Sequence, residues 1–200
     1  MTVEKVDRIA SALGGSLLLE MRWNGEQLDR LIDAAHAVVA DRAVAALRAA
    51  GWMSEVEVSF NWYGDRGRCD AVAFHPESRT LLIVEAKTRI GDVQDLLGRL
   101  AIKVRLGPHI ARQLGRAEPA RVIPCLVIAD SRTARRIVAA HAALFAHFNL
   151  RGRAALRWLG DPQPDPSVRG VLVFESLSDS RRATVRRRVR VAMPVDARQA

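Results

Sequence analysis

The chain has 200 residues, of which 49% are hydrophobic and 26% are charged, a balance typical of a folded domain and not of a disordered one. No apolar run approaches the roughly 18 residues that a membrane-spanning helix needs. The first residues carry acids among their bases, which argues against a signal peptide. We therefore expect a cytoplasmic protein with no membrane partner.

The formal net charge of +9 favours a polyanionic partner such as nucleic acid. Six arginines and no acid lie within residues 181–190, so the rest of the chain carries a net charge of only +3. Within this tail Arg186, Arg187 and Arg188 are candidates for sequence-independent DNA contacts. A tail that only improves solubility is an equal alternative.

Hydrophobic periodicity and turn residues predict alternating helices and strands. In chain order the first elements are a helix at 3–13, a strand at 16–23, a helix at 26–50 and strands at 55–62, 68–75 and 80–87. They are followed by a helix at 93–104 with a continuation past Pro108 toward 114, a strand at 121–129, a helix that begins at Ser131 or Asp130 with residues as far as Phe148 facing inward, a loop at 160–167 and a strand at 170–177. Three strands in a meander, followed by helix and strand in alternation, imply an α/β protein with a mixed sheet.

Local signals support several of these elements. Gly51 ends the long helix, and Asp92 is a suitable N-cap for the next one. In the helix that begins at Ser131, His141 is expected to face inward together with the apolar residues. Cys69 and Cys125 fall in predicted strands without any C-x-x-C or Cys/His cluster, so we interpret them as buried free thiols.

The hairpin "RCDAVAFHPESRTLLIVEAK", residues 68–87, contains the strongest functional signal. If residues 76–79 form a four-residue turn, paired positions sum to 155, and Asp70 lies opposite Glu85. Lys87 then shares a face with Glu85. Carboxylates about 5 Å apart repel by about 3 kcal/mol at an effective dielectric constant near 20. A divalent cation such as Mg²⁺ would relieve this repulsion, but so would an ordinary ion-pair cluster with the neighbouring bases.

An Asp on the second strand of the meander and a Glu-x-Lys at the end of the third resemble the PD-(D/E)XK nuclease superfamily. The specific segments are "GRCDAVAF" and "LLIVEAKTR", and the similarity covers roughly residues 26–130. The chain is most similar to the Holliday-junction-resolvase-like branch and to actinobacterial nuclease-like domains that often follow a helix-turn-helix module. The resemblance implies a restriction-endonuclease-like mixed sheet with an αβββαβ core and a nuclease-like domain at 25–178. The element pattern and the composition add an extension at 1–24 and a basic tail at 179–200.

The resemblance also assigns roles to individual residues. Asp70, Glu85 and the backbone carbonyl of Ala86 would bind Mg²⁺, for which Mn²⁺ can substitute, and Lys87 would be the catalytic lysine. Cys69 stands where the family motif has its proline. Asp41 is the candidate for the family's remaining acid on the first helix. Its position off the apolar stripe leaves a surface aspartate equally open, and His36 is an alternative.

Further basic residues are candidates for nucleic-acid contacts: Arg68 and Arg89 beside the acid pair, and Lys103 on the following helix. A solvated helix face is the alternative for Lys103. Asp65, in "YGDRG", is more typical of a turn than of a ligand. The four tryptophans are dispersed, without the alternation of basic and aromatic residues that is typical of a single-strand-binding surface.

These patterns lead to one functional hypothesis and two alternatives. The first is a Mg²⁺-dependent DNA endonuclease. The second is a non-catalytic DNA-binding or regulatory protein that retains the nuclease fold, and the third is an interaction domain without nucleic acid. The resemblance also implies two protein partners to consider, a second copy of the chain in a homodimer and a separate helix-turn-helix protein.

Overall fold

The computed structural model describes residues 2–17 and 26–176. The chain divides into a compact unit of residues 1–31 and a second one of residues 32–200. The first unit contains helix α1 (Val3–Ala12), which confirms the predicted helix and ends shortly before Gly14, a residue with a φ of 73°. The predicted strand at 16–23 falls mostly outside the described residues, and so do Arg186, Arg187 and Arg188.

The second unit is an α/β structure built on a six-stranded mixed sheet with the order β1-β2-β3-β4-β6-β5. The strands are β1 (Met53–Trp62), β2 (Asp65–His75), β3 (Thr80–Lys87), β4 (Arg121–Ala129), β5 (Leu150–Arg151) and β6 (Val171–Glu175). The first three form an antiparallel meander, whereas β3, β4, β6 and β5 pair in parallel. The mixed sheet that the sequence predicts is therefore confirmed.

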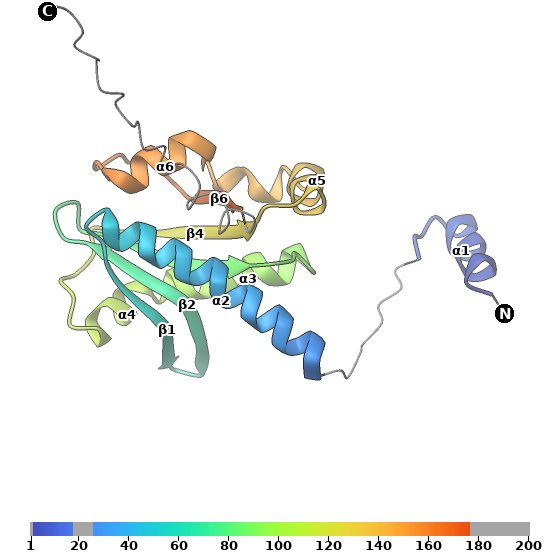
Figure 1. Ribbon diagram of the computed structural model, residues 1–200, viewed down its shortest axis with the longest axis horizontal. Helices are drawn as coiled ribbons and strands as arrows, with labels where there is room; N and C mark the ends of the chain where they lie inside the picture. Colours follow the sequence, from blue (N-terminus) through green and yellow to red (C-terminus); the bar gives the residue numbers. More distant parts are fainter. Residues whose placement is uncertain (1, 18–25, 177–200) are drawn as a thin grey trace, which may run out of the picture. The chain divides into compact units, whose positions relative to one another are not determined.

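Helices cover both faces of this sheet, so its central strands are buried on both sides (Figure 1). The helices are α2 (Glu26–Ala49), α3 (Val93–Arg105), α4 (Gly107–Gln113), α5 (Arg132–Ala140) and α6 (Gly152–Gly160), with a 3₁₀ turn, η1, at Leu144–His147. One core lies between the sheet and α3, α4, α5 and η1; the other lies between the sheet and α2 and α6. Burial on both faces explains why β3 is nearly continuously apolar.

Local chemistry sets the ends of the helices around the site. The side chain of Asp92 accepts hydrogen bonds from the backbone N–H groups of Gln94 and Asp95 at 2.8 and 3.0 Å, which confirms it as the N-cap of α3. The hydroxyl of Ser131 caps α5 in the same way, through the N–H of Ala134 at 3.1 Å. These caps fix where α3 and α5 begin relative to the ends of β3 and β4.

The prediction for the C-terminal third is wrong in one respect and incomplete in another. The helix expected from Ser131 ends at Ala140, and His141 is exposed because the chain leaves the helix there before the 3₁₀ turn η1. The short elements β5 and α6 were not expected at all. Their pattern is weak because, of the nine residues of α6, only Ala155 is fully buried.

Among the helices of the described residues, none combines the length and the apolar character that crossing a membrane requires.

Candidate active site

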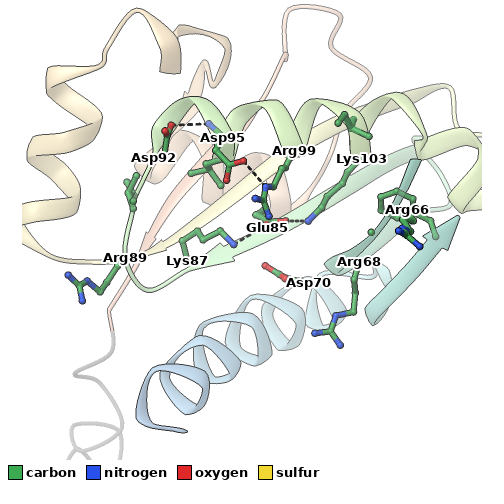
Figure 2. Close-up of a pocket in the computed structure, with 16 residues that line it drawn as sticks. Arg66, Arg68, Asp70, Glu85, Lys87, Arg89, Asp92, Asp95, Arg99 and Lys103 are labelled. Carbon is green, nitrogen blue, oxygen red and sulfur yellow. Dashed lines mark hydrogen bonds and ion pairs between the residues drawn. The ribbon is translucent and has the colours of Figure 1, made fainter. Parts of the chain in front are cut away.

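A cavity of about 490 Å³ opens beside the carboxyl end of β3 and is bounded by the β1–β2 hairpin and α3. Its lining brings together Asp70 from β2, Glu85 and Lys87 from β3, and Lys103 from α3 (Figure 2). The two predicted acids therefore border one cavity, and the predicted lysine lies with them. Polar groups that converge on a concave site are what small-ligand and catalytic sites require.

Glu85 is the buried charge of the site, with only 6% of its surface exposed. Its Oε1 lies 2.7 Å from Nζ of Lys87, and its Oε2 lies 2.5 Å from Nζ of Lys103. Burial alone would raise the pKa of Glu85, but the charge and hydrogen bond of Lys103, and then those of Lys87, outweigh it and hold the pKa below its ordinary value. Glu85 is therefore ionised, and its charge is shared by two ammonium groups.

Asp70 lies where the sheet loses its regular pairing. The β2–β3 pairs have the predicted register, from His75–Thr80 to Ala71–Val84, but the ladder ends there. Instead of a backbone partner, the N–H of Ala86 donates to Oδ2 of Asp70 at 2.7 Å. On the other side, the β1–β2 ladder omits Glu57, whose φ is 52°. The expected register is confirmed, but Asp70 is not a ladder partner of Glu85, because its carboxylate occupies the gap between the strands.

The donor set fits a small oxygen-seeking cation. In an extended strand the N–H and C=O of one residue point to the same side, so the carbonyl of Ala86 faces the gap in which its N–H meets Asp70. Among the described residues no group of three or more His, Cys, Asp or Glu side chains is suited to a metal. Two carboxylates, one carbonyl and water are ligands that Mg²⁺ accepts, and an ionised carboxylate has about four lone-pair sites, more than the contacts that the described residues make with either Asp70 or Glu85 use.

Helix α2 presents His36, and not Asp41, to the acid pair. The Nε2 of His36 lies 3.5 Å from Oδ2 of Asp70, and the imidazole is partly buried. Asp41 is exposed and borders a neighbouring hollow that also contains His36 and Asp70, but it does not line the cavity beside Glu85. Of the two residues proposed for the first helix, His36 is the one that contacts a candidate ligand.

Basic side chains surround the mouth of the cavity. Arg68 and Arg89, both predicted, line it, and so do Arg66 and Arg99. Arg68 is largely exposed and lies 3.7 Å from a carboxylate oxygen of Glu57, whereas Arg99 bonds Asp95 at 2.8 Å (Figure 2). Lys103 lies inside this ring instead: it is 9% exposed, so it does not lie on a solvated helix face.

Sequence reasoning missed Arg66, Arg99 and Asp95 as lining residues. Arg66 could have been found from strand periodicity, because it is two residues from Arg68 and shares its side of β2. Asp95 and Arg99 have the i, i+4 spacing of a helical ion pair, but such spacing is common and does not reveal that the pair borders a cavity.

Comparison of the chain with protein-family models finds no match, and no curated protein matches its sequence.

Proposed function

We propose that this protein is a magnesium-dependent nuclease that hydrolyses phosphodiester bonds in DNA, built on a restriction-endonuclease-like version of the α/β fold. The observation that carries the proposal is the convergence of Asp70, Glu85 and Lys87 on one cavity that is bordered by arginines. The order of helix, β-meander, helix and strand, with the acids on the second and third strands, supports the same reading.

Each group has a part that follows from its position. Asp70, Glu85 and the carbonyl of Ala86 would hold the cation, which when bound would polarise the phosphodiester and lower the pKa of an attacking water. Lys87 is 29% exposed and lies at the cavity, so its ammonium can donate to a phosphate oxygen as negative charge develops there. Lys103 lies deeper and holds the Glu85 carboxylate in place.

The arginines account for the choice of a polyanionic substrate. Arg66, Arg68, Arg89 and Arg99 present guanidinium groups around the cavity, where they can pair with successive phosphates. Contacts of this kind determine the affinity for DNA and its dependence on salt, but they do not distinguish one base sequence from another. We therefore expect cleavage that weakens steeply as the salt concentration rises.

The direct test is a plasmid-nicking assay with Mg²⁺ or Mn²⁺, with EDTA as the negative control. Wild type should nick only with metal, and Asp70→Asn, Glu85→Gln and Lys87→Ala should each reduce the rate by about a hundredfold or more. Asp130→Asn is a matched control, because this exposed carboxylate pairs with Arg135 and does not line the cavity. The same activity in wild type and the three site variants would count against the proposal.

Calorimetry separates metal binding from cleavage. Titration of wild type with Mg²⁺ or Mn²⁺ should give a binding isotherm that Asp70→Ala abolishes. Asp130→Asn should leave the isotherm unchanged. An isotherm that is identical in wild type and Asp70→Ala would place the metal elsewhere.

A non-catalytic DNA-binding protein is the second candidate, because both oxygens of Glu85 are already paired with lysine ammonium groups. In that case the cluster is a structural ion-pair network that needs no metal. DNA affinity that persists in Lys87→Ala, with no cleavage by either protein, would favour this candidate over the enzyme.

A further inference from the structure

The tip of the β1–β2 hairpin, which leads into the strand that carries Asp70, exposes aromatic rings. Tyr63 is 92% exposed and Trp62 is 38% exposed. The Trp62 ring packs against the imidazole of His109 on α4, with 3.9 Å between ring centroids, and Tyr63 meets Trp62 edge-on at 4.9 Å. Tyr63 is therefore the outermost ring of a supported aromatic cluster.

Side chains of α3 and α4 also hold the hairpin in place. Gln113 of α4 donates from Nε2 to the backbone carbonyl of Ser59 at 2.9 Å, and Arg105 of α3 donates to the Asp65 carboxylate at 2.5 Å. These contacts tie both strands of the hairpin to the helices beneath them. A rigid aromatic ring loses little conformational entropy when a flat partner stacks on it.

The backbone conformation of the turn does not explain why position 63 is a tyrosine. Tyr63 and Gly64 are the two central residues of the turn that Trp62 and Asp65 close, with φ values of 46° and 90°. A turn with two positive φ values favours Asn-Gly, and a bulky side chain at the first position is strained. Tyr63 is almost fully exposed, so burial does not offset this strain. Backbone strain that burial does not offset is a mark of functional positions.

Charge identifies the kind of partner. Arg66 follows the turn on β2, pairs across the hairpin with Asn61 and lines the cavity of the candidate site. Arg68 lies between Arg66 and Asp70 on β2 and extends this basic surface toward the candidate site (Figure 2). The dispersed tryptophans of the sequence predict no single-strand-binding surface, but the hairpin places exposed rings at one end of the row formed by Arg66 and Arg68. Rings beside cations match the bases and phosphates of a nucleic-acid strand.

The accessibility of the bases indicates which form of DNA the tip can bind. In duplex DNA both faces of each internal base are covered by neighbouring bases, so a side chain that stacks there must first separate a base step, whereas an unpaired base offers a free face without that cost. We propose that the Trp62–Tyr63 tip stacks on an unpaired base of the DNA substrate. The inference has a second part, which rests on the proposed nuclease activity: the tip selects DNA in which a single-stranded segment lies a few nucleotides from the cleaved bond.

The length of β2 sets the distance between the stacked base and the cleaved phosphate. About five residues separate Asp70 from Asp65 at the turn, which at about 3.3 Å per residue is about 17 Å. Stacked nucleotides rise about 3.4 Å each along one strand. The stacked base should therefore lie about five nucleotides from the cleaved phosphate.

Fluorescence anisotropy in EDTA tests the binding step without cleavage. Three labelled DNAs are compared: a blunt duplex, the same duplex with a single-stranded overhang, and a single strand. Tyr63→Ala should weaken binding of the two DNAs with unpaired bases by about tenfold and change binding of the blunt duplex by less than twofold. Tyr63→Phe should bind like wild type.

Tyr63→Asn is the control for a structural role. Asn is better suited to this turn, so the variant should be at least as stable to heat as wild type while losing the same affinity as Tyr63→Ala. An overhang that carries 2-aminopurine reports stacking directly. Its fluorescence should respond to wild type and not to Tyr63→Ala, most strongly about five nucleotides from the cleavage position.

Three results would overturn the inference. They are an equal loss of affinity for all three DNAs, no loss for any of them, and a change in self-association alone, which would make the tip an interface between two copies of the chain. The nuclease proposal is tested separately. Metal-dependent cleavage without a role for Tyr63 defeats only this inference, and tip-dependent binding of unpaired DNA without cleavage defeats only the nuclease proposal.

Discussion

Lys103 and Glu85 form a buried ion pair between α3 and β3, with 2.5 Å between Nζ and Oε2. The pair joins the helix that covers the cavity to the strand that carries two of the three candidate metal donors. Because Lys87 binds the other oxygen of the same carboxylate, the position of Glu85 is set from both sides.

Loss of this pair should cost stability. Lys103→Met leaves the buried Glu85 carboxylate with Lys87 as its remaining ammonium partner among the described residues, so we expect the free energy of unfolding in urea to fall by about 1–3 kcal/mol. Arg99→Met, on the same helix, removes a pair whose arginine is 73% exposed and should cost less than about 0.5 kcal/mol. Equal losses in the two variants would show that Lys103 contributes no more than a surface ion pair.

His36 should matter more for activity than Asp41. His36 contacts the carboxylate of Asp70, so on the proposed nuclease mechanism His36→Ala should slow metal-dependent cleavage by about tenfold through poorer positioning of that candidate ligand. Asp41→Asn should stay within about twofold of wild type, because this exposed side chain does not line the cavity of Glu85. Initial nicking rates at saturating metal measure both, and the reverse order would assign the first-helix role to Asp41.

Substitution by alanine should change the free energy of unfolding in opposite directions at two glycines. A Cβ at Gly107, the first residue of α4, would lie 2.5 Å from Cγ1 of Val122, so Gly107→Ala should cost about 1–3 kcal/mol. A Cβ at Gly98, inside α3, meets nothing within 4 Å, so Gly98→Ala should stabilise by about 0.5–1 kcal/mol. Urea denaturation compares the two, and a Gly107→Ala protein as stable as wild type would contradict the expected clash.

Cys125 should resist alkylation in the folded protein. Burial raises its pKa from 9.0 to about 12, so the neutral thiol is favoured and reactivity appears only as the pH rises toward that value. At about pH 8 the thiolate fraction is about one in ten thousand. Iodoacetamide labelling followed by peptide mass mapping should detect Cys125 only after guanidinium unfolding. Rapid labelling without denaturant would show that the strand opens locally.

The sequence alone predicted most of the elements and the placement of Asp70 and Glu85 on neighbouring strands of one hairpin. The loop of four residues after His75 was sufficient to predict the pairing that the ladder from Ala71 to His75 follows. Periodicity located all the strands of the meander and the strand at 121–129, and the capping pattern identified Asp92. These features depend on neighbours a few residues away, so a single sequence contains enough information to predict them.

Tertiary structure decided which distant side chains reach that pair. His36 and Lys103 face the acids because each helix, α2 and α3, is packed on the sheet with one particular side turned toward it. The buried contacts of the two cores, one on each face of the sheet, decide which side that is. The strand periodicity could not show that Asp70 leaves the ladder to bind Ala86, or that Trp62 and Tyr63 meet His109 from another helix. Secondary structure depends on turn residues and on the alternation of apolar residues along the chain. The site, in contrast, depends on packing between segments that are far apart in the sequence.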